Sequence, residues 1–233
     1  MLVSIHQPNL FPRLRTLKKI AQTDCLLVLE HVQFVRREWQ NRIVLRAYTS
    51  PSMEVMFSFP CQVKGRFSGN ISDIALKNFK HSKSKFMRQL EYLYSASPFY
   101  DEILAVAQSA LKYDIKTVAD LGIACLVELL NACNLDVKLL GTQQNKVLKK
   151  CDLLAWHCAT IGASAYLTGR GGLKYMDTKP FRCANVEVLA FSFTPPTDDL
   201  NWDQSSCIDY IARYGCKTLR CFLTSPTQLE RVI

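Results

Sequence analysis

Three polar side chains, His6, Gln7 and Asn9, stand at the end of a short, mostly apolar segment at residues 2–6. An imidazole, whose ordinary pKa is about 6.5, can act as a general acid or base, or it can contact a phosphate oxygen. The amides can orient a polar ligand, and an asparagine can also cap a helix. The alternative is a histidine that only fixes the turn by hydrogen bonding. We favour a site, because ligands of open α/β sheets bind at the carboxyl ends of strands.

A second polar group stands at the end of the predicted strand at 25–30. Glu30 and His31 are candidate catalytic residues after His6, because a carboxylate beside an imidazole can orient and polarise it. Adjacent strand residues point to opposite faces, so the pair can act together only where the strand has already ended. A solvated strand end is the alternative. Gln33 follows and is a candidate for lining the same pocket.

The segment from Trp39 to Arg42 is dense in hydrogen-bonding groups. Arg42 could bind a carboxylate or phosphate through two parallel hydrogen bonds. Trp39 could stack on a sugar or base, and Asn41 could bind a polar group. The alternative is a hairpin edge with a surface arginine. We predict that His6, Gln7, Asn9 and Arg42 line one cleft.

A glycine-rich segment follows a short predicted strand at 165–168. Its members are Thr168, Gly169, Arg170, Gly171 and Gly172. Backbone N–H groups of such a turn could surround an anion, and the arginine would add charge. The segment matches neither a Walker A loop nor a dinucleotide-binding fingerprint, so a plain turn is the alternative. Tyr175 follows and could close the pocket.

The elements that must position these groups alternate between strands and helices. Strands are predicted at 2–6, 25–30, 136–140, 165–168 and 186–193, a β-hairpin at 41–48 and 53–59, a loop at 64–70, and helices at 14–22, 79–95, 98–111, 117–130, 146–161 and 210–214, the last closed by Gly215. This order predicts one α/β domain over residues 1–233. It has a mainly parallel sheet with flanking helices, a β-hairpin and an α-helical insertion at approximately 76–133.

Composition narrows the function classes. The chain has 233 residues, 48% hydrophobic, and no apolar run long enough for a membrane span. It has no signal-peptide pattern, and its ten cysteines form no C-x-x-C pair, so we expect a cytoplasmic protein without zinc, disulfide or other cofactor. The net charge of +9 fits RNA, a membrane surface or an anionic substrate. Small basic clusters such as 13–19 favour a small phosphate-bearing ligand over nucleic acid.

Several motifs together resemble the WbqC-like protein family, over roughly residues 3–215. They are His6-Gln7-Pro8-Asn9, Lys19-Ile20-Ala21-Gln22, Asp24, Val32-Gln33-Phe34, Trp39-Gln40-Asn41-Arg42, Tyr166-Leu167-Thr168-Gly169, Gly171-Gly172, Tyr175 and Phe181. The chain departs from the family pattern at Arg13–Arg15 and at Glu30–His31, which concerns the substrate more than the fold. The resemblance implies a setting in the biosynthesis of O-antigen sugars or other natural products.

From this resemblance we expect an enzyme that transfers an acyl or aminoacyl group to an amine of a nucleotide-linked sugar or a secondary-metabolite precursor. His6 would move the proton, and the aminoacyl donor could be linked to a carrier or to tRNA. One alternative is an ATP-using ligase or nucleotidyltransferase with a HUP-like fold. Another is a noncatalytic protein that binds RNA or a carrier. The sequence does not assign an oligomeric state.

Overall fold

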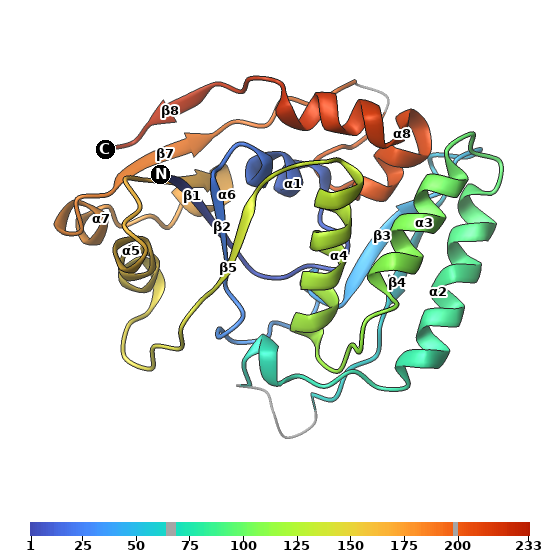
Figure 1. Cartoon of the computed structure of the whole chain (residues 1–233), viewed down its shortest axis with the longest axis horizontal. Helices are drawn as coiled ribbons and strands as arrows, with labels where there is room; N and C mark the ends of the chain where they lie inside the picture. The colour runs from blue at the N-terminus through green and yellow to red at the C-terminus, as the bar shows by residue number, and fades with distance from the viewer. Residues whose placement is uncertain (64–68, 198–199) are drawn as a thin grey trace.

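The computed structural model describes residues 1–63, 69–197 and 200–233. It confirms an α/β fold with a six-stranded, mostly parallel sheet, flanking helices and a separate antiparallel hairpin (Figure 1). The strands are β1 (Leu2–His6), β2 (Cys25–Val28), β3 (Arg42–Arg46), β4 (Glu54–Ser58), β5 (Lys138–Gly141), β6 (Ala165–Gly169), β7 (Glu187–Phe191) and β8 (Leu229–Arg231). The helices are α1 (Leu14–Ala21), α2 (Phe79–Tyr94), α3 (Tyr100–Ala110), α4 (Val118–Ala132), α5 (Lys150–Thr160), α6 (Arg170–Leu173), α7 (Lys179–Cys183) and α8 (Cys207–Thr224), with a 3₁₀ turn, η1, at Ile71–Asp73.

The strand order of the large sheet is β5-β2-β1-β6-β7-β8. All neighbouring pairs are parallel except β7 with β8. The chain runs from β1 outward to β2 and β5, then crosses to β6 and β7 on the other side of β1. The winding therefore reverses between β1 and β6. In open α/β sheets such a reversal opens a crevice at the carboxyl ends of the two strands.

The central strands of the sheet are buried on both faces, and the side chains of β2 pack against the helices on each face. Cys25 and Leu27 pack in the cluster that contains residues of α5 and α7. Leu26 and Val28 pack in the cluster that contains residues of α1, α4 and α8. Because side chains alternate along a strand, an uninterrupted apolar run is required here. Figure 1 shows α5 and α7 on one side of the sheet and α1, α4 and α8 on the other.

The hairpin of β3 and β4 is joined to α8 by a buried polar network. The Asp209 carboxylate accepts hydrogen bonds from the Arg46 backbone N–H at 2.8 Å, the Tyr94 hydroxyl at 2.8 Å and the Ser206 N–H at 3.1 Å. The Arg46 guanidinium lies 3.6 Å from the same carboxylate. Burial raises the pKa of Asp209, while the hydrogen bonds and Arg46 oppose that shift. The network thus fixes the positions of β3, α2 and α8 relative to one another.

Several predicted boundaries differ from the structure. The strand predicted at 25–30 ends at Val28, which leaves Glu30 and His31 outside it. The helix predicted at 146–161 begins at Lys150, because the Asn145 side chain accepts hydrogen bonds from the next backbone N–H groups, at 147 and 148. The prediction that Gly215 closes the helix containing residues 210–214 is confirmed in part, because the Gly215 backbone is non-helical but a further helical segment follows it.

At Gly215, with φ 76°, α8 is kinked, and its second helical segment continues to Thr224. The first segment, which contains the predicted residues 210–214, begins after a capping box formed by Ser206 and Asp209. Helix α7 and strand β8 were not predicted. Residues 64–68 of the predicted loop lie outside the described residues. Helices α2–α4 fall in the span of the predicted insertion, and both that insertion and the single domain stay predictions.

Both ends of the chain lie at the amino edge of the parallel strands. The Met1 ammonium donates to Ser164 Oγ at 2.8 Å, immediately before β6. Strand β8 runs antiparallel to β7, and the Val232 N–H donates to the Val188 carbonyl at 2.9 Å. Within the described ranges, no helix combines the length and apolar character needed to cross a membrane.

Candidate functional site

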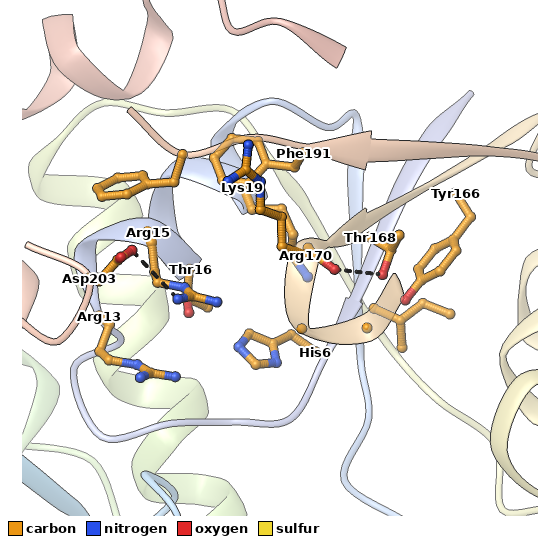
Figure 2. A pocket seen from close by; sticks show the side chains of 15 residues that line it. His6, Arg13, Arg15, Thr16, Lys19, Tyr166, Thr168, Arg170, Phe191 and Asp203 are labelled. Carbon is orange, nitrogen blue, oxygen red and sulfur yellow. Dashed lines mark hydrogen bonds and ion pairs between the residues drawn. The ribbon is translucent and has the colours of Figure 1, made fainter. Parts of the chain in front are cut away.

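A cavity of about 330 Å³ opens at the carboxyl ends of β1 and β6, where the winding of the sheet reverses. Figure 2 shows the His6 imidazole between side chains of α1 and the turn of α6. The lining residues are Ile5, His6, Arg13, Arg15, Thr16, Lys19, Tyr166, Thr168, Gly169, Arg170, Gly171, Gly172, Phe191, Phe193 and Asp203. The sequence thus brings together the end of its first strand and the glycine-rich segment more than 150 residues later.

The charge of this cavity is strongly positive. Arg13, Arg15, Lys19 and Arg170 contribute cations, and Asp203 is the acidic residue among the described lining residues. Asp203 lies 3.5 Å from Arg15. The other three cations form no ion pair with a described carboxylate. A polar and cationic pocket of this size suits a small ligand with a phosphate group.

The same charges shift the pKa of two basic groups. Burial lowers the pKa of His6 well below its ordinary value, and Lys19, Arg13 and Arg15 lower it further. Burial, followed by repulsion from Arg15, lowers the pKa of Lys19 to about 8. The imidazole is therefore neutral at neutral pH and can accept a proton, while most of the lysine is still charged. Perturbed groups gathered in one cleft are typical of functional sites.

One face of helix α1 points toward the cavity and carries two of its cations. Arg15 and Lys19 are four residues apart, so they lie on the same face of the helix. The helix has no acidic residue in its first turn, although the positive end of the helix dipole favours one there. An anionic ligand would relieve this repulsion. Lys18, on another face, donates to carbonyls of Phe222 and Ser225 at the end of α8 and so anchors α1.

The glycine-rich segment is a short helix, α6, and not the open turn that was predicted. A Cβ atom at Gly172 would lie 2.4 Å from the Thr168 hydroxyl, so a larger residue there would force that side chain to move. Gly169 and Gly171 face open space, within the cavity lining. Arg170 is held at the rim by a hydrogen bond to Ser192 Oγ at 3.3 Å. The segment thus supplies one wall of the cavity and one cation.

Gln7 and Asn9 lie behind the cavity instead of lining it. Both border a much smaller hollow of about 10 Å³, which His6 also borders. The Gln7 side-chain oxygen accepts a hydrogen bond from the buried Gln40 amide at 2.7 Å. A Cβ atom at Gly122 of α4 would lie 2.7 Å from backbone and side-chain carbons of Pro8. These contacts fix the turn that follows His6.

Trp39 and Arg42 lie in a neighbouring hollow that shares Arg13 with the main cavity. The guanidinium carbons of Arg13 and Arg42 lie 5.2 and 5.6 Å from the Trp39 ring centre. Such contacts are cation–π interactions. Asn41 donates to the Phe59 carbonyl at 2.8 Å and holds the start of the hairpin. The structure thus places Arg42 and His6 in two separate, neighbouring hollows, and Arg13 lines both of them.

Glu30 and His31 lie together beyond the end of β2 and outside the main cavity. Their side chains approach to 3.9 Å, because the strand ends before them. Gln33 forms an isolated antiparallel bridge with Asn70. Tyr175 is 86% exposed and does not line the cavity.

Sequence reasoning missed several cavity residues: Arg13, Arg15, Thr16, Lys19, Tyr166, Phe191, Phe193 and Asp203. The basic cluster at 13–19 was the available signal, since it directly follows the His6 turn. All ten cysteines are free. Within the described residues, no group of three or more His, Cys, Asp or Glu side chains is arranged to hold a metal ion.

Comparison with known proteins assigns a family. The model of the WbqC-like protein family matches residues 7–220. The chain is similar to an uncharacterized protein of Mycobacterium tuberculosis (strain ATCC 25618 / H37Rv), Rv1507c, with 26% identity over 193 residues that cover 82% of each protein. No solved structure matches the chain significantly.

Proposed function

The chain belongs to the WbqC-like protein family, and from that premise we propose that it is a biosynthetic transferase. It moves an acyl or aminoacyl group to the amine of a phosphate-bearing acceptor, such as a nucleotide-linked sugar or a secondary-metabolite precursor. The observation that carries the proposal is the meeting of a neutral His6 with four cations in one cavity. The proposal keeps the cytoplasmic location expected from the sequence.

The cations account for the phosphate-bearing half of the acceptor. Arg13, Arg15 and Arg170 offer planar guanidinium groups, which match phosphate oxygens through paired hydrogen bonds. Lys19 adds a compact charge deeper in the cavity. The apolar rings of Phe191 and Phe193 provide a surface for the remainder of the ligand.

His6 accounts for the reactive half. An amine attacks a carbonyl carbon only through its lone pair, and it must lose a proton as the nitrogen–carbon bond forms. His6 takes that proton, and the bond from the carbonyl carbon to the donor's thiol or alcohol then breaks. The proton passes to the departing group, which restores the neutral imidazole. Burial, together with the surrounding cations, lowers the pKa of His6 and keeps it unprotonated beforehand, so it is ready as a base.

Two matched variants test the proposal. Arg170→Ala should weaken binding of inorganic pyrophosphate and of a nucleotide-linked amino sugar by about 10-fold or more, because it removes a charged hydrogen bond. Arg182→Ala, on the exposed surface of α7, removes the same charge away from the cavity and should bind normally. Titration calorimetry measures both. Equal affinities for the two variants would refute a phosphate site in the cavity.

His6→Gln separates catalysis from binding. It keeps a hydrogen-bonding side chain but removes the titrating group, so binding and folding should be retained. Formation of the acylated sugar, followed by mass spectrometry with thioester and aminoacyl donors, should fall by about 10²–10⁴-fold. Near-normal turnover would leave His6 only a positioning role.

One observation favours a second candidate, the ATP-using ligase or nucleotidyltransferase. The order β5-β2-β1-β6-β7 places the first strand at the centre and the reversal beside it, which is the arrangement of nucleotide-binding doubly wound sheets. An ATP–pyrophosphate exchange assay distinguishes the two. Exchange that depends on His6 would support this candidate, and transfer without ATP would support the first. Binding of RNA with a steep salt dependence would instead support the noncatalytic alternative.

A further inference from the structure

A serine, a histidine and a carboxylate lie in a row beyond the end of β2, away from the main cavity. Ser72 Oγ is 3.4 Å from His31 Nδ1, and His31 Nε2 is 3.9 Å from Glu30 Oε1. We propose that these three residues form a second, nucleophilic site, at which Ser72 accepts the acyl group of an activated ester or thioester. The site goes beyond the proposed function, since it requires neither the cavity at His6 nor a phosphate-bearing acceptor.

Backbone hydrogen bonds hold the three residues in place. The Glu30 N–H donates to the Val28 carbonyl, so the chain turns directly after β2. The Ser72 N–H donates to the Glu30 carbonyl at 3.2 Å, and the Ile71 N–H donates to the Val32 carbonyl at 3.0 Å. Turn η1 is therefore attached to the segment that carries the histidine. The backbones that carry the nucleophile and its base are therefore held next to each other.

The order of the contacts defines the roles. For the Ser72 hydroxyl to donate its proton, His31 Nδ1 must be the unprotonated nitrogen, and Nε2 then carries the hydrogen. That N–H faces the Glu30 carboxylate, which favours this tautomer and stabilises the imidazolium that forms after proton transfer. The 3.9 Å separation is longer than a hydrogen bond, and catalytic contacts of this kind are often longer before substrate binds.

The site is open to a substrate. The side chains of His31 and Glu30 are 31% and 23% exposed, and Ser72 is half-buried. The nucleophile is thus neither sealed in the core nor surrounded by bulk water.

The reaction follows from these positions. The Ser72 oxygen attacks the carbonyl carbon of the donor while its proton moves to His31, which yields a tetrahedral intermediate. The bond from that carbon to the donor's thiol or alcohol then breaks, and His31 returns the proton to the departing group. The product is a Ser72 ester, which an amine or water cleaves to restore the hydroxyl.

Local backbone geometry limits the donor class. The N–H groups of Ser72, Asp73 and Ile74 already donate to the carbonyls of Glu30, Asn70 and Ile71. They cannot also stabilise a developing oxyanion without breaking these bonds. The site therefore suits strongly activated acyl groups, such as thioesters and nitrophenyl esters, and not amides.

A fluorophosphonate probe and p-nitrophenyl acetate test the site on the full-length protein. Peptide mass spectrometry should map the covalent label to Ser72. Ser72→Ala should abolish labelling, and His31→Gln should slow it by about 10²-fold or more. Ser84→Ala is the matched control, because Ser84 is exposed on α2 and donates only to the Lys80 carbonyl. It should label as the unchanged protein does.

Two results would overturn the proposal. One is a label on another residue, or none at all, in the unchanged protein, a result that does not depend on the folding of any variant. The other is undiminished labelling of Ser72 in folded His31→Gln, because the serine would then not depend on the histidine. Neither result alters the pyrophosphate titrations that test the cavity at His6, so the two proposals fail independently.

Discussion

Replacing Gly122 by alanine sets two effects against each other. Alanine in a helix interior is more favourable than glycine by about 1 kcal/mol, so α4 considered alone would be stabilised. In the folded protein the new methyl group would lie 2.7 Å from two carbons of Pro8 and 2.8 Å from the Asn9 nitrogen. Two of these three atoms belong to the backbone and cannot rotate away. Overpacking of this kind typically costs about 1–3 kcal/mol.

Because backbone atoms make the closest contacts, we expect a cost in the upper part of that range, about 2–3 kcal/mol, which leaves a net loss of about 1–2 kcal/mol in the free energy of unfolding after the helix preference is subtracted. For a chain of this length that corresponds to a fall in melting temperature of about 2–8 °C. Because the contact is with the turn directly after His6, binding of pyrophosphate should weaken as well. Urea unfolding and titration calorimetry measure the two effects.

Gly171→Ala provides the matched control. It also places alanine in a helix, but no atom lies within 4 Å of the added carbon, so stability should be unchanged or slightly higher. If Gly122→Ala were as stable as the unchanged protein, the close packing of α4 on the His6 turn would not constrain that turn. The reasoning would then be refuted.

Two further predictions concern charge. The pKa of Lys19 lies at about 8, so pyrophosphate affinity should fall by up to about tenfold per pH unit above pH 8 as the free protein loses this proton. Lys19→Arg stays charged and should lack this component, and calorimetry that finds parallel pH profiles for the two proteins would contradict the prediction. Asp209→Ala should lower the free energy of unfolding by about 3 kcal/mol or more, because the buried donors of Arg46 N–H, Tyr94 hydroxyl and Ser206 N–H lose their common acceptor, although the Arg46 guanidinium keeps its ion pair with Glu54. Urea denaturation showing a loss below about 1 kcal/mol would contradict this value.

Elements with strong local patterns could be predicted from the sequence. β1, α1 and the hairpin are examples, because apolar periodicity and turn residues act over a few positions. The helix break at Gly215 could be predicted, but the second helical segment after it could not, since only the contacts of the following residues decide whether a helix resumes after a glycine at positive φ. Strand β8 has three residues and depends entirely on pairing with β7.

The cavity illustrates the harder problem. His6 and Arg170 could be identified as candidates because each lies at the carboxyl end of a strand, but their meeting depends on β6 lying beside β1. From the sequence alone, Arg15 and Lys19 would be assigned to a solvated helix face. The strand order of the sheet instead places them over the crevice. Ser72 stands 41 residues from His31, and no motif connects the two. Long-range strand order, which single-sequence patterns do not encode, therefore determined most of what was missed.

The placement of the two chain ends has a practical consequence for experiments. Met1 adjoins the start of β6, and Val232 pairs beside the start of β7, whereas the cavity opens at the other end of the same strands. A protein tethered to a sensor surface through either end would therefore turn its cavity toward the solution. Immobilisation through surface lysines offers no such assurance, because Lys19 itself lines the cavity and its lowered pKa makes it a reactive amine at pH 8.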